Sequence, residues 1–235
     1  AKYTTTVSTQ PFLFLTVDIP PPPLFKDELV GNVIPQVPIY TCLEKFDGET
    51  TKKFLSGERR RYSLTKLPKY LIIHLQRFVK NSFYVEKNPT IVNFPIRNLD
   101  LIDCLEPSLR EKVLAEREQE EDPNAPPVDY KKAFGSTRYD LVSNIRHEGK
   151  AGEGNYKVHC HHHASDRWFD IQDLVVEETI PQLIAVSEGY LLVFERQKTH
   201  QITIGAANLA QSTGDDAATT TNTTNTPATA TAVKQ

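Results

Sequence analysis

The residues best suited to catalysis or metal binding are histidines that cluster late in the chain. Five of the seven histidines lie between residues 147 and 163: His147, His159, His161, His162 and His163. Imidazole can serve as a general base near neutral pH or as a zinc ligand. On a strand His159, His161 and His163 would share one face, and His162 would point the other way. That pattern leaves a zinc site open, but we favour solvated histidines at a strand end because the sequence fixes no carboxylate beside them.

The cysteines offer little further chemistry. Cys42, Cys104 and Cys160 lie far apart and form no C-x-x-C pair. This spacing argues against a disulfide framework and against a thiolate zinc site. We therefore expect reduced thiols, no bound metal and no cofactor.

Extended segments must position the histidines. Alternating or continuous apolar residues and β-branched residues predict a set of strands: Tyr139–Ile145, "YKVHCHH" after a glycine loop, "RWFDIQDLVV" as a strand or turn, and Tyr190–Arg196. "LPKYLIIHLQRF" carries a near-continuous apolar run from Tyr70 to Leu75, which predicts a buried central strand. Arg77, just after it, is expected to pair with a nearby carboxylate, and Trp168 to anchor the core.

The remaining segments predict an α+β domain in which strands dominate. "PFLFLTVDI", Ile34–Leu43 and Thr90–Ile96 read as extended, with prolines at their ends, and "KNSFYVEKN" reads as a hairpin. Leu99–Gln119 has helical spacing, and its helix should break or start at Pro107.

Composition narrows the classes of function. The 235 residues are 39% hydrophobic and 24% charged, with a net charge of -3. This balance argues against broad nucleic-acid binding through a basic face, and we expect no direct DNA binding; the short run Arg59, Arg60 and Arg61 leaves a local basic patch open. No segment is long and apolar enough to span a membrane, so no membrane partner is expected. The chain starts at Ala1 and has no methionine, so we expect a segment of a longer protein.

Several motifs occur in an order that is similar to one known family. "LTKLPKYLIIHLQRF", then "YDLVSNIRHEGKAGEGNYKVHCHHHASDRWFDIQDLVV", then "GYLLVFER" resemble the lead strand, the histidine box and the closing strand of ubiquitin-specific proteases, peptidase family C19. The resemblance implies a papain-like cysteine-protease fold. It divides the chain into a fingers-like β region (1–63), a palm (64–198, with an insertion at about 115–135) and a disordered Ala/Thr-rich tail (199–235). The helical thumb, with the nucleophile position, would lie upstream.

The resemblance also locates the catalytic positions, and none of them is intact. In the family a thiolate attacks the isopeptide carbonyl, the histidine of Gly-His-Tyr moves the proton, and the first of two acidic residues after a tryptophan orients that histidine. Here the triplet is Gly154-Asn155-Tyr156, and the acidic pair falls at Gln172 and Asp173. An amide has no basic lone pair near neutral pH and cannot replace the histidine.

Two further comparisons with the family follow. His147 matches a non-catalytic histidine, and the other four histidines lie along the strand beyond Tyr156, so rescue of the missing base is not expected. The fingers of many members hold zinc with two C-x-x-C pairs, but the corresponding region holds Cys42 alone. We expect hydrophobic packing to hold it instead, through Phe14, Leu15, Leu24, Ile34, Val37, Ile39, Leu43 and Phe46.

The degenerate box resembles that of the splicing-factor branch of the family. "FLFLTVDIPPPPLFKDE", "IPQVPIYTCLEKFDG" and "FVKNSFYVEKNPTIVNFPI" carry the same resemblance. It implies a non-catalytic scaffold in pre-mRNA splicing, located in the nucleus, with proteins of the spliceosomal tri-snRNP as partners. Two alternatives stay open: a receptor that binds ubiquitin without cleaving it, and an active deubiquitinase with a non-standard base.

Overall fold

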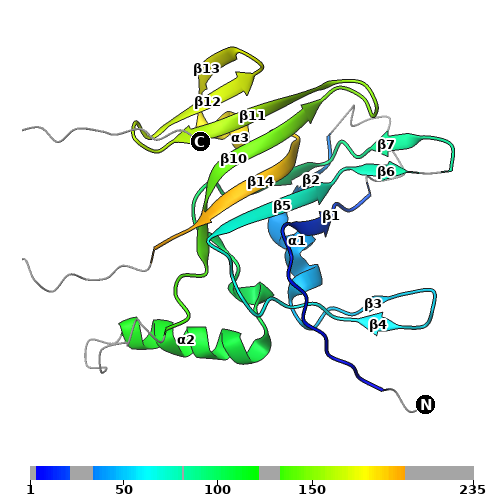
Figure 1. The fold of residues 1–235 in the computed structure, drawn as a ribbon, viewed down its shortest axis with the longest axis vertical. Helices are drawn as coiled ribbons and strands as arrows, with labels where there is room; N and C mark the ends of the chain where they lie inside the picture. The colour runs from blue at the N-terminus through cyan, green and yellow to red at the C-terminus, as the bar shows by residue number, and fades with distance from the viewer. Residues whose placement is uncertain (1–3, 22–33, 81, 122–132, 199–235) are drawn as a thin grey trace, which may run out of the picture. The chain divides into compact units, whose positions relative to one another are not determined.

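A mixed β-sheet of eight strands organises the chain (Figure 1). The computed structural model describes residues 4–21, 34–80, 82–121 and 133–198. Along the sheet the strands run β1 (Leu15–Asp18), β5 (Tyr70–Gln76), β14 (Gly189–Arg196), β10 (Arg138–Glu148), β11 (Asn155–His162), β12 (Arg167–Gln172) and β13 (Val175–Thr179). β9 (Leu99–Asp100) pairs with the start of β10. Only β1 and β5 run parallel among these pairs.

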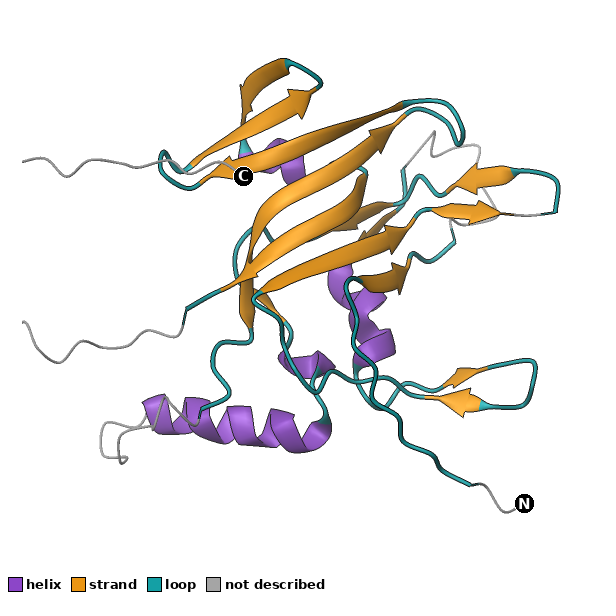
Figure 2. Cartoon of the chain, in the orientation of Figure 1, coloured by secondary structure: helices purple, strands orange, loops and turns teal. Residues whose placement is uncertain are grey.

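Short elements surround this sheet (Figure 2). Three small pairs accompany it: β2 (Gln36–Pro38) with β8 (Ile91–Asn93), β3 (Lys52–Lys53) with β4 (Arg59–Arg60), and β6 (Phe78–Lys80) with β7 (Val85–Lys87). The helices are α1 (Ile39–Leu43), α2 (Pro107–Glu121) and α3 (Pro181–Ala185), with 3-10 turns at Glu44–Phe46 and Ile102–Cys104. In the part of the chain that the structure describes, no helix is both long and apolar enough to cross a membrane.

The core lies on one face of the sheet. Leu71, Ile73 and Leu75 of β5 are fully buried, as are Leu192 and Phe194 of β14. Other apolar side chains pack with them in one cluster, among them Leu15, Val17, Ile39, Leu43, Phe46, Leu99, Leu101, Leu105, Val113, Tyr139, Leu141 and Trp168. The α+β prediction is confirmed, and Trp168 belongs to the core as expected.

The strand β5 is central, but only one of its faces is buried. The sequence predicted a buried central strand from the near-continuous apolar run. In the structure Ile72 and His74 alternate with the buried leucines and isoleucine and are only half-buried. The predicted strand is therefore central and is buried on one face, because side chains of a strand alternate between faces and this sheet has one open face.

The front of the chain departs from the prediction in two respects. Ile39–Leu43 forms a helix rather than continuing the extended segment, with Pro38 at its N-cap in an extended conformation. Proline pre-sets the backbone for a helix start and can also end a strand, so the sequence left both outcomes possible. Among the predicted packing residues, Leu15, Ile39, Leu43 and Phe46 are buried and Val37 packs against the core, whereas Phe14 and Ile34 are 49% and 51% exposed.

Other elements match the sequence patterns. α2 begins at Pro107, the second of the two alternatives, so Leu101 and Leu105 precede the helix. The hairpin β6–β7 and the strands β10, β11 and β14 fall where they were predicted. Leu24 and the tail 199–235 lie outside the described residues. The boundary between 63 and 64 stays a prediction, although β1, from the front segment, pairs directly with β5.

Arg77 ties three parts of this fold together. Its side chain is completely buried just after β5. Nη1 donates to the carbonyl oxygens of Asn88 (3.1 Å) and Thr90 (2.6 Å), and Nε donates to that of Gly189 at the start of β14. The predicted carboxylate partner was wrong. The guanidinium instead satisfies backbone carbonyls from segments distant in sequence, which a local pattern cannot reveal.

We predict that Arg77→Ala lowers the free energy of unfolding by about 2–4 kcal/mol, because it leaves buried carbonyls without donors. Urea denaturation followed by tryptophan fluorescence measures this change. The control is Arg60→Ala, which removes an exposed guanidinium bound to Glu58 and should cost less than about 1 kcal/mol. Equal effects of the two substitutions would contradict this role of Arg77.

Candidate functional site

The residue at the predicted base position stands at the rim of the sheet. Asn155 opens β11, is exposed, and pairs in register with Glu148 of β10. The preceding Gly154 has φ +139°, and a Cβ there would lie 2.1 Å from the carbonyl oxygen of Glu148 and 3.0 Å from Nε2 of His147. Only glycine permits this close crossing of the chain. The turn therefore fixes Asn155 at the mouth of the loop 149–154.

The predicted orienting position lies at the end of the next strand. Gln172 ends β12, is half-buried, and pairs with Val175. Asp173 follows in the turn with φ +51° and is exposed. Within the described residues no hydrogen bond joins the side chains of Asn155 and Gln172. Both of the predicted catalytic positions thus carry side-chain amides, which have no basic lone pair near neutral pH.

His147 is the histidine nearest to this rim. It pairs in register with Tyr156, the residue after Asn155, and it is 5% exposed. Its ring packs edge-on against Phe78 (5.1 Å between centroids) and Tyr156 (5.0 Å). Burial lowers the pKa of His147 below the ordinary 6.5, and the charge of Lys87 lowers it further. The imidazole of His147 therefore favours its neutral form, and the rings of Phe78 and Tyr156 cover it.

His159 is buried in a polar network on the opposite face of β11. Its Nδ1 lies 3.3 Å from Nδ2 of Asn144, and its Nε2 lies 3.9 Å from Oδ1 of Asp170. Nδ2 of Asn144 also donates to Oγ of Ser187, just after α3. Burial and the charge of Arg146 lower the pKa of His159. Asn144 thus links the imidazole to the segment after α3, and His159 is only 3% exposed.

The other three histidines lie at the far end of β11. His161 is six positions beyond Asn155, which corresponds to about 20 Å along a strand. Nε2 of His161 lies 2.9 Å from Asp166, Nδ1 of His162 lies 2.8 Å from Oγ of Ser165, and His163 lies 3.8 Å from Glu195. The separation of about 20 Å along the strand places these three histidines far from Asn155.

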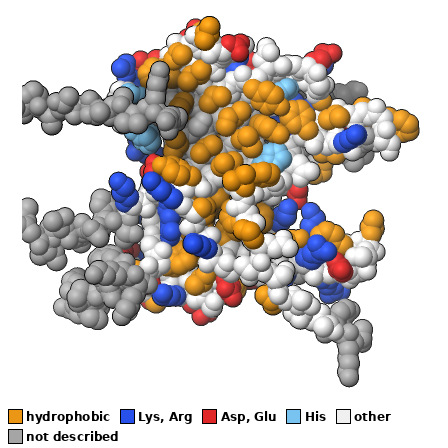
Figure 3. All heavy atoms as spheres, in the orientation of Figure 1, with side chains coloured by type: hydrophobic (Ala, Val, Ile, Leu, Met, Phe, Trp, Pro, Cys, Tyr) orange, Lys and Arg blue, Asp and Glu red, His pale blue; other side chains and the backbone are white. Residues whose placement is uncertain are grey.

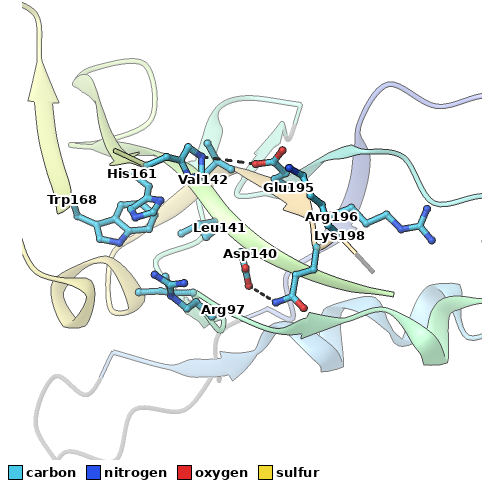
Figure 4. Close-up of a pocket in the computed structure, with 12 residues that line it drawn as sticks. Arg97, Asp140, Leu141, Val142, His161, Trp168, Glu195, Arg196 and Lys198 are labelled. Carbon is cyan, nitrogen blue, oxygen red and sulfur yellow. Dashed lines mark hydrogen bonds and ion pairs between the residues drawn. The ribbon is translucent and has the colours of Figure 1, made fainter. Parts of the chain in front are cut away.

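His161 and His163 line a shallow pocket of about 270 Å³ (Figure 4). His161 stacks on the buried Trp168 with 4.9 Å between ring centroids. The acidic side chains there are engaged: Asp140 accepts from Gln197, and Glu195 approaches His163. Among the described residues, no three His, Cys, Asp or Glu side chains converge to hold a metal.

The open face of the sheet carries a chain of rings that the sequence analysis missed. We call it the aromatic face, formed by Phe14, His74, Phe78, His147, Tyr156 and Tyr190. Successive centroids lie 5.0–5.9 Å apart, from Phe14–His74 to His147–Tyr156. Figure 3 shows hydrophobic side chains gathered over β5, β14 and β10. These rings come from five separate segments, so no single sequence motif predicts that they cluster.

Lys87 secures the loop beside the aromatic face. Its Nζ donates to the carbonyl oxygens of His147 (2.7 Å) and Gly149 (3.1 Å) and lies 2.5 Å from Glu188. The lysine side chain is 10% exposed. A charged donor shared among these acceptors fixes the start of the loop 149–154 against β14. The loop and the aromatic face together form a preorganised surface next to Asn155.

The buried histidines give a directional pH prediction. His74, His147 and His159 all have a pKa lowered from 6.5 by burial. Each therefore contributes stability that is full above about pH 6.5 and is lost as pH falls toward the folded pKa. Burial acts to raise the pKa of Asp100, but hydrogen bonds from Thr137 and Arg117 hold it below 3.8. The contribution of this carboxylate to stability is therefore lost only at a pH below the range in which the histidines titrate.

We expect the free energy of unfolding to fall between about pH 7.5 and about pH 5.5. His159→Gln should reduce this fall, whatever it does to stability at the higher pH, because the unfolded chain then binds one proton fewer. Urea denaturation at both pH values measures the difference. An unchanged pH dependence in the variant would show that His159 does not titrate differently on folding.

Comparisons with known proteins agree with this geometry. The profile described as "Ubiquitin carboxyl-terminal hydrolase" matches residues 23–194. Human "Ubiquitin carboxyl-terminal hydrolase 39" is 42% identical over 83% of this chain and 32% of its own length. The "Probable mRNA-splicing protein ubp10" of Schizosaccharomyces pombe is 37% identical over 79% of this chain and 34% of its own length. The chain thus spans about a third of these relatives.

Solved structures share the fold at lower identity. The Ubp8-containing SAGA DUB module aligns with a TM-score of 0.53 and 19% identity, over 80% of this chain and 35% of the other. A structure described as an essential yeast splicing factor aligns with a TM-score of 0.50 and 22% identity, over 80% of this chain and 37% of the other. The papain-like α+β fold predicted from the sequence is confirmed.

Proposed function

Because this chain belongs to the ubiquitin carboxyl-terminal hydrolase family, we propose that it keeps that fold as a protein-binding scaffold and performs no proteolysis. The setting we propose is pre-mRNA splicing in the nucleus, in the assembly or stability of the tri-snRNP. Support for this setting comes from the 37% identity to a protein named for mRNA splicing. Tri-snRNP proteins are then the partners.

The observation that carries the proposal is the exposed amide of Asn155 at the base position. Cysteine proteolysis needs a group that accepts the thiol proton and returns it to the leaving amine. The amide of Asn155 has no basic lone pair, and Gln172 is not bonded to it. Loss of a base of this kind typically lowers the rate by several orders of magnitude.

A substitute base would have to come from a neighbouring histidine, and the geometry disfavours each one. His147 is enclosed by Phe78, Tyr156 and the Gly154 crossing. His159 is held beneath α3 through Asn144. The remaining histidines lie at the distal end of β11. Only His147 lies close to the rim where Asn155 stands, and it is 5% exposed, with a pKa lowered by burial.

Exposed apolar side chains suit a role in assembly. On the β6–β7 hairpin Phe83 is 95% exposed and Tyr84 is 59% exposed. Such aromatic residues supply large contact areas at protein interfaces. The hairpin therefore offers a surface on which a scaffold can bind a partner, apart from the degenerate site.

A second candidate function is ubiquitin binding without cleavage, and the aromatic face favours it. Tyr156 is 54% exposed, and its ring packs against those of His147 and Tyr190. Together with the loop secured by Lys87, this surface could hold an extended polypeptide tail. Loss of the base would leave such binding intact, because binding needs no proton transfer.

One experiment separates the catalytic, receptor and scaffold functions. The full-length protein is mixed with ubiquitin carrying a fluorogenic leaving group, and binding of unmodified ubiquitin is followed in parallel by NMR. We expect no turnover, because the base position holds an amide. Turnover that is abolished by His147→Gln or by a substitution of His159, His161, His162 or His163 would overturn the non-catalytic proposal.

The binding measurement then ranks the two non-catalytic functions. Absence of ubiquitin binding supports the scaffold alone. Binding that Tyr156→Ala weakens by about tenfold or more moves the receptor to first place, since burying one aromatic ring at an interface can contribute more than 1 kcal/mol. Phe83→Ala is the matched control, because it removes an exposed aromatic ring outside the aromatic face.

A further inference from the structure

β13 is the outer strand of the sheet at the end opposite to β1. It pairs in register with β12, from Trp168↔Thr179 to Gln172↔Val175. Within the described residues no strand pairs with its other side (Figure 1). A strand in this position presents a row of unpaired backbone N–H and C=O groups to solvent. These groups form a ready template for another extended segment.

The strand lacks several of the features that usually block such pairing, although it carries two glutamates, Glu177 and Glu178. It contains no proline, no lysine or arginine, and its pairing with β12 shows no bulge. Its apolar side chains are open: Val175 is 58% exposed, Val176 is 59% exposed, and Leu174 just before it is 98% exposed. Ile180, just after the strand, is 54% exposed. Exposed aliphatic side chains beside an unpaired strand edge favour pairing with a partner strand.

The negative charge of the strand indicates that the partner segment carries a basic residue. Glu177 is exposed, faces Asp170 across the β12–β13 pair, and forms no ion pair within the described residues. Asp170 is already engaged by Arg146 at 2.6 Å. Glu178 is bound by Arg167 at 3.0 Å. A carboxylate at the open edge therefore stands without a cation opposite it.

We propose that β13 binds an extended segment of another protein, which adds a strand to the sheet and places a lysine or arginine opposite Glu177. Backbone hydrogen bonds along Val175–Thr179 would supply the attachment, as in other cases of strand addition. Aliphatic residues flanking the basic residue would cover Val175 and Val176. This surface lies on β13 and is independent of both the Asn155 position and the splicing proposal.

Two other occupants fit the edge less well. In an antiparallel pair of two copies centred on Glu177, the two Glu177 carboxylates would stand opposite each other, and like charges at that position are destabilising. The chain's own residues 205–235 contain a single basic residue, Lys234, one position from the end. Neither occupant supplies a basic residue within an aliphatic strand.

The test uses the full-length protein and two synthetic probes. One fluorescent peptide of about eight residues alternates lysine with valine and threonine, and the other replaces each lysine by glutamate. Amide hydrogen exchange of residues 175–179 is measured with and without each peptide, and affinity is measured by anisotropy. We expect the basic peptide alone to slow exchange in β13.

Charge reversal supplies the specificity control. Glu177→Lys should weaken binding of the basic peptide by about tenfold and favour the acidic peptide, because it turns an attractive cross-strand pair into a repulsive one. Glu153→Lys is the matched control, since Glu153 is exposed on the loop 149–154. It should leave the affinity unchanged.

Several results would overturn the proposal. Exchange in β13 that neither peptide slows, or that both slow equally, excludes a basic partner strand. Protection that rises with protein concentration, together with a doubled mass, assigns the edge to a second copy. Protection without peptide that disappears when 200–235 are removed assigns it to the chain's own tail.

Discussion

The buried guanidinium of Arg77 is the constraint on which the rest of the structure depends. It stands at the point where β5 ends, and it donates to carbonyl oxygens of Asn88, Thr90 and Gly189. These acceptors belong to the approach to β8 and to the first residue of β14. One planar donor thus holds the end of β5, the approach to β8 and the start of β14 together, because a buried arginine tolerates little displacement of its acceptors. Phe78, the next residue, is thereby placed in the aromatic face.

Alternation along the central strands gives the sheet two different faces. On one face Leu71, Ile73 and Leu75 build the core, and on the other His74 joins the aromatic face. The geometry around Asn155 is equally well determined, through the close crossing at Gly154 and the clamp of Lys87. The fold therefore presents a preorganised surface next to Asn155. A surface of this kind suits the binding role that we propose.

The sequence predicted the elements whose periodicity was long and regular. β10, β11, β14 and the β6–β7 hairpin follow directly from alternation and turn residues. The helix α1 was missed, because a short apolar segment after Pro38 suits either a strand or a helix. The partners of Arg77 and the members of the aromatic face could not be predicted, since both sets come from segments far apart in the chain. The degenerate positions were found only through resemblance to a family.

The most direct test of the central claim replaces both degenerate amides at once. Cells depleted of the full-length protein would express either the natural sequence or the Asn155→Ala/Gln172→Ala variant, and the tri-snRNP would be measured by gradient sedimentation. Our account predicts that depletion lowers the tri-snRNP fraction and that the double variant restores it as fully as the natural sequence does. A variant that folds and is expressed equally but fails to restore the tri-snRNP would contradict the account, because it would show that these positions still carry chemistry.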